Sequence, residues 1–179
     1  MANITTGNAL IDFDLPTSEG QTCNGYQYLK GATALILVFT TGHCSYVQAW
    51  EARINALARD YAPRDVRMLA IDPGETASYP PNSPDSMVGP VSQMEYIFPY
   101  LFDERREVAR AYGAQVTPEV FLFDAVGILR YHGAVDDNDA DENAVTISYL
   151  QKALQQYLDG GTITMPESQP VGCPIEWKS

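Results

Sequence analysis

The sequence predicts an α/β protein built on a mixed β-sheet that is flanked by helices. Two strand-length apolar runs, Leu35–Phe39 and Val66–Asp72, enclose the stretch Tyr46–Tyr61, in which apolar residues recur at steps of three and four. This order indicates a strand, an amphipathic helix and a second, parallel strand. Further on, Val120–Asp124 and Ile128–His132 are separated by a short turn, which indicates a β-hairpin. Parallel and antiparallel pairs therefore share one sheet.

The first half of the chain supplies an N-terminal extension and the first unit of the sheet. Asn8–Pro16 alternates briefly and stops at a proline, so we expect an irregular lead-in with a short strand, followed by a short helical turn at Tyr26–Leu29. Pro63 ends the first long helix. Glu75–Pro90 contains four prolines and is expected to be a long surface loop.

The second half of the chain alternates short elements and ends in a tail. The remaining elements that we predict are a helix over Val91–Ile97, a strand over Tyr100–Asp103, a helix over Glu104–Tyr112 that Gly113 ends, and a final helix over Val145–Leu158. Residues 159–179 contain three prolines and form the tail. The 179 residues fit one domain, 1–179, with the tail packed on it.

The charge balance limits the partners. Eleven basic residues face twenty-three acidic ones, which leaves a net charge of −12. We expect neither nucleic acid nor an anionic membrane as a partner, because the chain has little positive charge with which to replace counterions. Residues 1–10 lack the basic and apolar regions of a secretory signal, and the longest apolar run is too short to span a bilayer. A cytoplasmic location is therefore expected.

A single cysteine stands where the first strand passes into the first long helix. Cys44 follows Gly42 and His43 there, so its sulfur lies near the free N–H groups of the helix. The positive end of the helix dipole favours a thiolate, which is the reactive form of cysteine. His43 would increase the thiolate content if it were charged, or orient a proton transfer, or simply point away. We therefore expect Cys44 to be a redox nucleophile; the alternative is a partly buried structural cysteine.

The order of the elements is that of the thioredoxin-like layout, and five segments extend the resemblance. The chain resembles the peroxiredoxin-like branch of the thioredoxin superfamily, related to the alkyl hydroperoxide reductase and thiol-specific antioxidant proteins. The matching segments are HCSYV at 43–47 (family HCPYV), FPYLFDE at 98–104 (FPYLxDE), VARAYGA at 108–114 (VAxAYGA), TPEVFLFD at 117–124 (TPDxFLFD) and GCPIEW at 172–177 (GCxIKW).

The chain departs from the family pattern at the active turn. Where the family often has a first cysteine, giving CxxC, this chain has Thr41. Thr41 is similar to the threonine of the TxxC motif in true peroxiredoxins, whose hydroxyl helps to hold the peroxide, although Leu37 replaces the proline that opens that motif. The active-site arginine of true peroxiredoxins cannot be placed. No arginine lies near Thr117–Pro118, and Arg130 lies beyond the hairpin turn.

Two further positions have roles that the resemblance suggests. Thr117–Pro118 is similar to the cis-proline turn that packs against the active cysteine and presents backbone to substrate. Cys173 is either a resolving cysteine, which attacks a sulfenic acid on Cys44 and closes a disulfide, or a tail cysteine that only packs. Cys23 follows a turn and is expected to be structural, while remaining a rival resolving partner.

These observations predict a thiol-dependent oxidoreductase with no cofactor. Cys44 would attack a peroxide or a disulfide, and thioredoxin or a small thiol would reduce the product. A non-catalytic thioredoxin-like binding module is the alternative, and a metal carrier that uses His43 and Cys44 is a third. The acidic loop Asp136–Glu142 lacks the glycine and terminal glutamate of a calcium loop, so we expect a solvated loop and no metal site.

Overall fold

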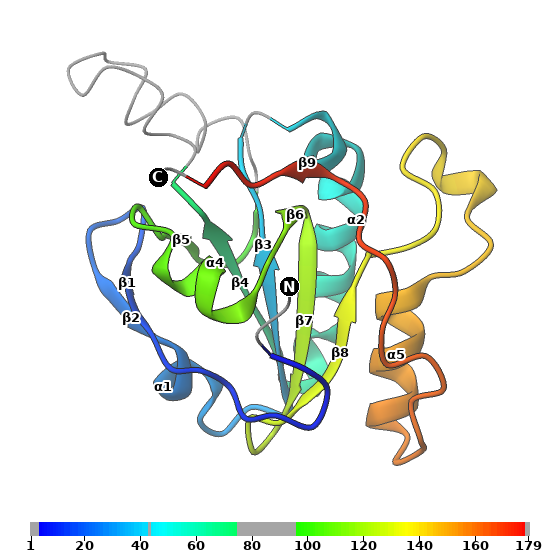
Figure 1. Cartoon of the computed structure of the whole chain (residues 1–179). Helices are drawn as coiled ribbons and strands as arrows, with labels where there is room; N and C mark the ends of the chain where they lie inside the picture. The colour runs from blue at the N-terminus through cyan, green and yellow to red at the C-terminus, as the bar shows by residue number, and fades with distance from the viewer. Residues whose placement is uncertain (1–3, 43, 75–95, 178–179) are drawn as a thin grey trace.

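A five-stranded mixed sheet organises the protein (Figure 1). The computed structural model describes residues 4–42, 44–74 and 96–177. The strands lie in the order β5-β4-β3-β7-β8. They span Tyr100–Phe102 (β5), Val66–Asp72 (β4), Ala34–Phe39 (β3), Glu119–Asp124 (β7) and Leu129–Gly133 (β8). β3, β4 and β5 are parallel, while β7 runs antiparallel to both β3 and β8. This confirms the predicted α/β class and the mixed sheet.

Helices cover both faces of the sheet. All six residues of β3 are buried, because alternate side chains point to opposite layers. Leu35, Leu37 and Phe39 face the layer that contains α4 (Glu107–Tyr112) and the N-terminal segment. The other three, Ala34, Ile36 and Val38, face α2 (Ser45–Tyr61) and α5 (Tyr149–Leu158). A continuous apolar run thus becomes a central strand with no solvated face.

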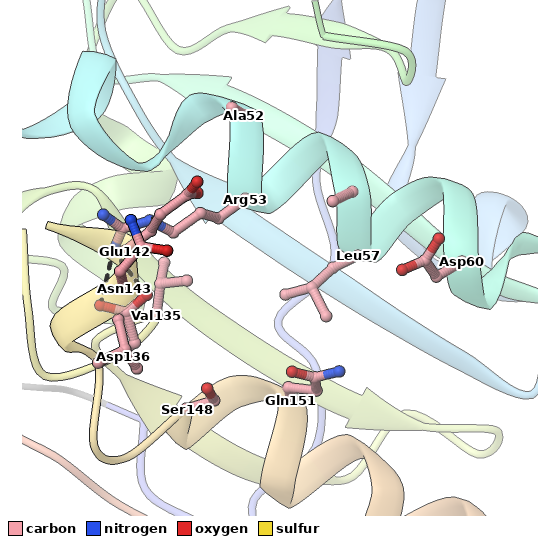
Figure 2. Close-up of a pocket in the computed structure, with 12 residues that line it drawn as sticks. Ala52, Arg53, Leu57, Asp60, Val135, Asp136, Glu142, Asn143, Ser148 and Gln151 are labelled. Carbon is pink, nitrogen blue, oxygen red and sulfur yellow. Dashed lines mark hydrogen bonds and ion pairs between the residues drawn. The ribbon is translucent and has the colours of Figure 1, made fainter.

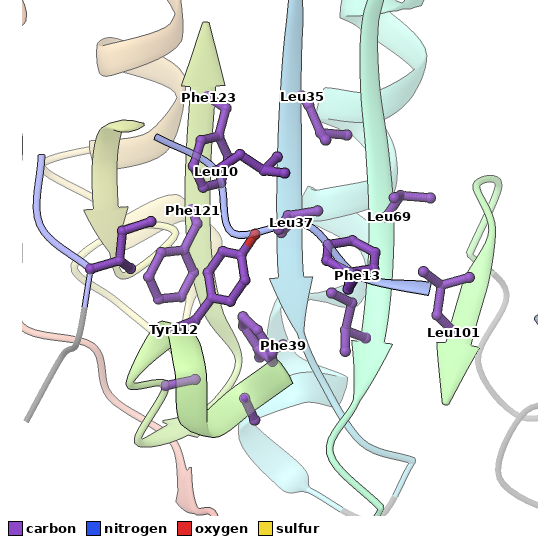
Figure 3. Close-up of a cluster of buried hydrophobic side chains, with 14 of the residues drawn as sticks. Leu10, Phe13, Leu35, Leu37, Phe39, Leu69, Leu101, Tyr112, Phe121 and Phe123 are labelled. Atoms are coloured by element: carbon purple, nitrogen blue, oxygen red, sulfur yellow. The ribbon is translucent and has the colours of Figure 1, made fainter. Parts of the chain in front are cut away.

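Tyr112 is the centre of the core on the α4 side (Figure 3). Its ring packs at 5.8 Å, 5.6 Å and 6.1 Å from the rings of Phe39, Phe121 and Phe123. Its hydroxyl donates a hydrogen bond of 2.7 Å to the carbonyl of Ile11. The N-terminal extension is therefore tied to the core by a buried tyrosine whose polar end is satisfied.

The N-terminal extension is more regular than the lead-in predicted from the sequence. β1 (Asp14–Pro16) and β2 (Thr22–Asn24) form an antiparallel pair, and the short helix α1 (Gly25–Leu29) follows. The Asn24 side chain caps α1 by accepting the Gln27 N–H at 2.9 Å. Short 3-10 turns, η1 (Ala62–Arg64) and η3 (Glu142–Ala144), complete the connections.

Two predicted helices begin later than expected. α4 begins at Glu107 and not at Glu104, because Arg106 adopts a left-handed conformation with φ of 58°. α5 begins at Tyr149 and not at Val145. The residues before it are held to the acidic loop, where Thr146 N–H donates to Asp137 at 2.9 Å. The predicted loop Glu75–Pro90 lies outside the described residues, as does all but the end of the predicted helix Val91–Ile97.

The tail returns over the domain and pairs with two of its strands (Figure 1). Ser168 N–H donates to the His132 carbonyl of β8 at 3.1 Å. Further on, β9 (Cys173–Pro174) pairs antiparallel with β6 (Val116–Thr117). Residues of the tail thus pair with two strands of the domain. Within the described parts of the chain, no helix is both long enough and apolar enough to cross a membrane.

Candidate redox site

Cys44 lies at the junction predicted from the sequence. It is the N-cap residue of α2, with extended φ and ψ of −95° and 122°, and it is 1% exposed. The 17-residue helix that follows directs its free N–H groups and its positive dipole end toward this position. The fold therefore provides an electrostatic environment that favours negative charge on the sulfur.

Cys44 and Cys173 form a disulfide. The two residues are 129 positions apart, and their Cα atoms are 6.0 Å apart. Cys173 lies on β9 directly opposite Thr117 and is only partly buried. The tail thus brings a second sulfur to the active turn, which the sequence left open. Cys23, the rival partner, is a free and partly buried cysteine on β2, where burial and the nearby Asp14 carboxylate raise the pKa of its thiol.

The turn before β7 lies against the sulfur of Cys44. The Thr117–Pro118 peptide bond is cis, as the resemblance led us to expect. The Thr117 carbonyl oxygen is 3.1 Å from Cys44 Sγ. In the reduced protein the Cys44 thiol can donate a hydrogen bond to this carbonyl, which stabilises the protonated form. The carbonyl and the helix dipole therefore act on the sulfur in opposite directions.

Gly172 allows the tail to come this close. A Cβ built on Gly172 would overlap the Thr117 carbonyl and crowd the nitrogen of Pro118. Both atoms belong to backbone that packs against Cys44, so they have little room to move. A residue with a side chain at position 172 would push β9 away from β6. The need for a glycine at position 172 was not predicted, because Gly172 entered the prediction only as part of the segment GCPIEW.

Thr41 and Thr117 have buried side-chain hydroxyls. Thr41 precedes Cys44 by three residues, and Thr117 contacts it through its carbonyl; both are fully buried. Among the described residues, neither side-chain hydroxyl has a hydrogen-bond partner. Buried hydroxyls without partners are available to a small polar ligand. His43 lies outside the described residues, so its role stays a prediction.

Aromatic side chains surround the redox pair. Tyr100 packs in one buried cluster with Cys44, and Tyr96, Phe98 and Cys173 pack against that cluster. The Tyr96 ring stacks on Phe98 at 4.8 Å, and its hydroxyl lies 3.1 Å from that of Thr40. Burial raises the pKa of Tyr96 well above its usual range, so it remains a neutral phenol. These aromatic side chains pack as the sequence led us to expect, and the cluster that they form includes Cys44.

The Glu119 carboxyl group holds the backbone next to β6, the strand that pairs with the tail. Its side chain is 3% exposed and accepts the N–H groups of Gln115 and Val116 at 2.8 and 3.4 Å. Burial raises the pKa of this carboxyl group, although these two hydrogen bonds oppose the shift. On the other side of the same segment, the Gln115 carbonyl accepts the N–H of Ile175 from the tail. Through these hydrogen bonds Glu119 holds the backbone of β6 and of Gln115, on which the tail docks.

The end of the tail rests on two arginines of the α4 region. Arg106 is 5% exposed; it donates from Nε to the Pro73 carbonyl at 2.7 Å and from Nη1 to the Glu176 carbonyl. The guanidinium of Arg110 lies 5.5 Å from the ring centre of Trp177. Arg130, the arginine considered from the sequence, instead pairs with Asp124 at 2.6 Å. The sequence pattern carried no signal for Arg106.

A cavity lies between α2, α5 and the acidic loop, away from the redox pair (Figure 2). It has a volume of about 380 Å³. At its edge Asp136 accepts Trp50 Nε1–H at 2.8 Å and pairs with Arg53 at 2.8 Å. The expectation that the acidic loop is wholly solvated is therefore wrong at Asp136, which fastens the loop to α2. Within the described chain, no group of three or more acidic, histidine or cysteine side chains is arranged to hold a metal.

The fold and the redox pair together define a thioredoxin-like protein. Residues 6–132 match the AhpC/TSA family, so the chain belongs to that family. This confirms the resemblance to the peroxiredoxin-like branch. Family membership together with the Cys44–Cys173 disulfide supports a thiol-dependent oxidoreductase.

Solved structures extend the likeness to the whole chain. An uncharacterized conserved protein from Geobacillus kaustophilus is 31% identical, with a TM-score of 0.86, over 99% of this chain and 95% of that one. A hypothetical protein from Sinorhizobium meliloti 1021 is 30% identical, with a TM-score of 0.85, over 98% and 96%. A peroxidoxin from Mycobacterium tuberculosis shares the fold at 16% identity, with a TM-score of 0.61, over 87% and 97%. No curated protein matches the chain significantly.

Proposed function

We propose that the protein is a two-cysteine thiol peroxidase in which Cys44 is the nucleophile and Cys173 resolves it. The observation that carries this proposal is the disulfide between a helix N-cap cysteine and a cysteine of the tail. A helix N-terminus stabilises the thiolate needed for attack, and a second thiol at the same turn removes the oxidised product. The family supports this class of chemistry.

The proposed reaction balances in three steps. The Cys44 thiolate attacks the outer oxygen of a peroxide, the O–O bond breaks, and an alcohol or water leaves, so that Cys44 becomes a sulfenic acid. The Cys173 thiol attacks this sulfur and releases water as the disulfide forms. Two equivalents of an external thiol, from thioredoxin or a small molecule, then restore both cysteines and are themselves oxidised to a disulfide.

The structure favours one order of attack during reduction. Cys44 is 1% exposed, whereas Cys173 is only partly buried. An incoming thiolate therefore reaches Cys173 first and forms a mixed disulfide with it. Cys44 then leaves as a thiolate at the N-terminus of α2, where the dipole stabilises it.

Each of the groups around Cys44 has a role in the proposed reaction. The hydroxyl of Thr41 would donate to the peroxide, with the hydroxyl of Thr117 as a second buried donor. Thr117 and Pro118 would present backbone to the substrate, and His43 would assist the proton transfer. A disulfide substrate is the alternative oxidant, because the same thiolate would attack sulfur in place of oxygen.

One equivalent of peroxide, followed by mass mapping without reductant, tests the proposal. We expect a peptide pair that joins Cys44 to Cys173, and in Cys173→Ser we expect a sulfenic acid on Cys44 that dimedone traps. Cys23→Ser is the matched control and should behave like the wild type. A wild-type protein whose Cys44 and Cys173 both remain reduced would contradict the resolving role.

A non-catalytic thioredoxin-like module is the second candidate function. The observation that favours it is the Thr117 carbonyl at 3.1 Å from Cys44 Sγ, in an apolar site that favours the neutral thiol. In that case the disulfide would only stabilise the fold. Reduced protein that leaves hydrogen peroxide and an organic hydroperoxide unchanged would support the module.

A further inference from the structure

The tail makes contacts beyond Cys173 that involve no sulfur. Ile175 is 4% exposed, and its N–H donates to the Gln115 carbonyl at 2.9 Å. The Glu176 carbonyl accepts from Arg106, and Trp177 lies against Arg110. Since none of these contacts requires the S–S bond, all of them can persist when the disulfide is reduced. Residues 175–177 are called the latch below.

Arg106 joins the latch to the rest of the fold. It is buried, and its backbone has the positive φ of 58° that is uncommon outside glycine. Its guanidinium donates to carbonyls at the end of β4, Pro73 and Gly74, and to Glu176 of the tail. A buried charge needs hydrogen-bond acceptors, so loss of the tail would take away one acceptor of Arg106. The arginine therefore favours the docked tail.

We propose that Arg106 is a positioning residue for the redox couple. Through the latch it holds Cys173 beside Cys44 in the reduced protein as well as in the oxidised one. This inference rests on the proposed function, because it concerns the same pair of sulfurs. It adds that the position of Cys173 is maintained by the chain after the covalent bond has opened.

The proposal has a thermodynamic consequence. In the exchange with glutathione, two glutathione molecules reduce the disulfide and leave as oxidised glutathione, so the equilibrium depends on the effective concentration of Cys173 at Cys44. A variant without the latch lets the reduced tail move freely. Its disulfide is then easier to reduce, and a tenfold change in the equilibrium constant equals about 30 mV in potential.

A second consequence concerns access to Cys44. Cys44 is 1% exposed in the disulfide form, in which its sulfur is bonded to Cys173 of the docked tail. A freed tail would expose the Cys44 thiol. Loss of the latch should therefore raise the rate at which iodoacetamide alkylates Cys44 in the reduced protein, while making the disulfide less stable toward reduction.

Redox titration of Arg106→Ala in glutathione buffers tests the proposal. We expect a potential less negative than that of the wild type by about 30 mV, which is about tenfold in the equilibrium constant. Arg105→Ala is the matched control: Arg105 is the neighbouring arginine, its side chain is 84% exposed, and its variant should keep the wild-type potential. Trp177→Ala and Ile175→Ala change the tail alone and decide the question if Arg106→Ala does not fold.

Several outcomes would overturn the proposal. A folded Arg106→Ala with the wild-type potential would do so, as would tail variants whose potential and alkylation rate match the wild type. A merely structural arginine would lower the melting temperature of both redox forms equally and leave the potential unchanged. The potential of the wild type tests the redox couple itself, whereas the shift between variants tests the latch. The two failures are thus distinguishable.

Discussion

The two cysteines of the redox pair are held in very different ways. Cys44 lies between a six-residue strand with no exposed residue and a 17-residue helix, and it is buried itself. Cys173 lies on a two-residue strand in the tail, and it is held by pairing with β6 and by the few contacts of the latch. The domain fold positions one sulfur, and a short docked segment positions the other.

The two cysteines therefore meet different structural requirements. In the proposed function, Cys44 as the nucleophile needs a fixed environment, which the strand-to-helix junction supplies. Cys173, as the proposed resolving partner, needs to approach Cys44 and also to move aside for substrate, which a segment with few contacts permits. Changes at Cys44 should therefore abolish the chemistry, whereas changes in the tail should alter its equilibrium and rate.

The largest effect is expected at the fixed sulfur. Cys44→Ser should lower peroxide consumption in the presence of dithiothreitol by at least about a thousandfold, because hydroxyl oxygen is a far weaker nucleophile than a thiolate. Peroxide assays on the purified variant measure this. Cys23→Ser is the control, and a Cys44→Ser protein with wild-type activity would refute the assignment of the nucleophile.

The next largest effect should be the loss of unfolding free energy when the disulfide is reduced. The bond closes a loop across a sequence separation of 129, and chain entropy alone gives about 4 to 5 kcal/mol of unfolding free energy for a loop of this size. The melting temperature of the wild type should fall by roughly 10 °C when dithiothreitol is added. Cys173→Ala should melt at one temperature with and without reductant. An equal response to reductant in this variant would contradict the expectation.

Gly172→Ala should weaken the docking of the tail while it leaves the Cys44 side chain itself unchanged. The new methyl group would meet the Thr117 carbonyl, so β9 cannot dock on β6 as closely. We expect disulfide formation after a peroxide pulse to slow by about tenfold, since about 1.4 kcal/mol of lost docking energy has that effect. Stopped-flow tryptophan fluorescence or quenched mass mapping measures the rate. Gly161→Ala, where the added carbon would lie 3.4 Å from the Gln156 carbonyl, is the control.

The smallest effect concerns the pH dependence of stability at Glu119. Burial raises the pKa of this carboxyl group above its ordinary value of 4.5. The folded state keeps the proton to a higher pH than the unfolded state does, so stability falls as the pH rises from the ordinary value through the folded pKa. Above that window the loss is complete.

Glu119→Gln tests this dependence. The amide removes the titrating charge and keeps an oxygen for the N–H groups of Gln115 and Val116. We expect a higher melting temperature than that of the wild type at about pH 8 and a smaller difference near about pH 4. Glu19→Gln, at an exposed position, should follow the wild type at both values. A Glu119→Gln profile parallel to that of the wild type would show that the charge is not the cause.

Much of the domain followed from local patterns in the sequence. The periodicity in Tyr46–Tyr61 and the apolar runs at β3, β4 and β7 predicted their elements to within one residue, because their side chains meet a core in a regular repeat. The starts of α4 and α5 were wrong. The start of α4 depends on the left-handed backbone of Arg106, and the start of α5 depends on a hydrogen bond that Thr146 N–H donates to Asp137, nine positions earlier in the chain.

In the candidate site, the sequence indicated the positions that the domain supplies but not the position of the tail. The strand-to-helix junction singled out the position of Cys44, and the family resemblance singled out the Thr117–Pro118 turn, which is cis in the structure; the chemical roles of these residues stay predictions. The path of the tail was not predictable, because it depends on backbone pairing between residues almost sixty positions apart, such as Thr117 and Cys173. For the same reason Gly172 and Arg106 gave no signal, since both act on main-chain carbonyls and not on a side chain of complementary type.

Equilibrium redox titration with mass mapping tests the central claim, that Cys44 and Cys173 form a working redox couple. The account predicts one two-electron transition, carried by the Cys44–Cys173 peptide pair, with a midpoint between about −270 and −120 mV, where known thiol redox proteins lie. A midpoint below about −300 mV, typical of structural disulfides, would contradict it. So would two cysteines that titrate independently.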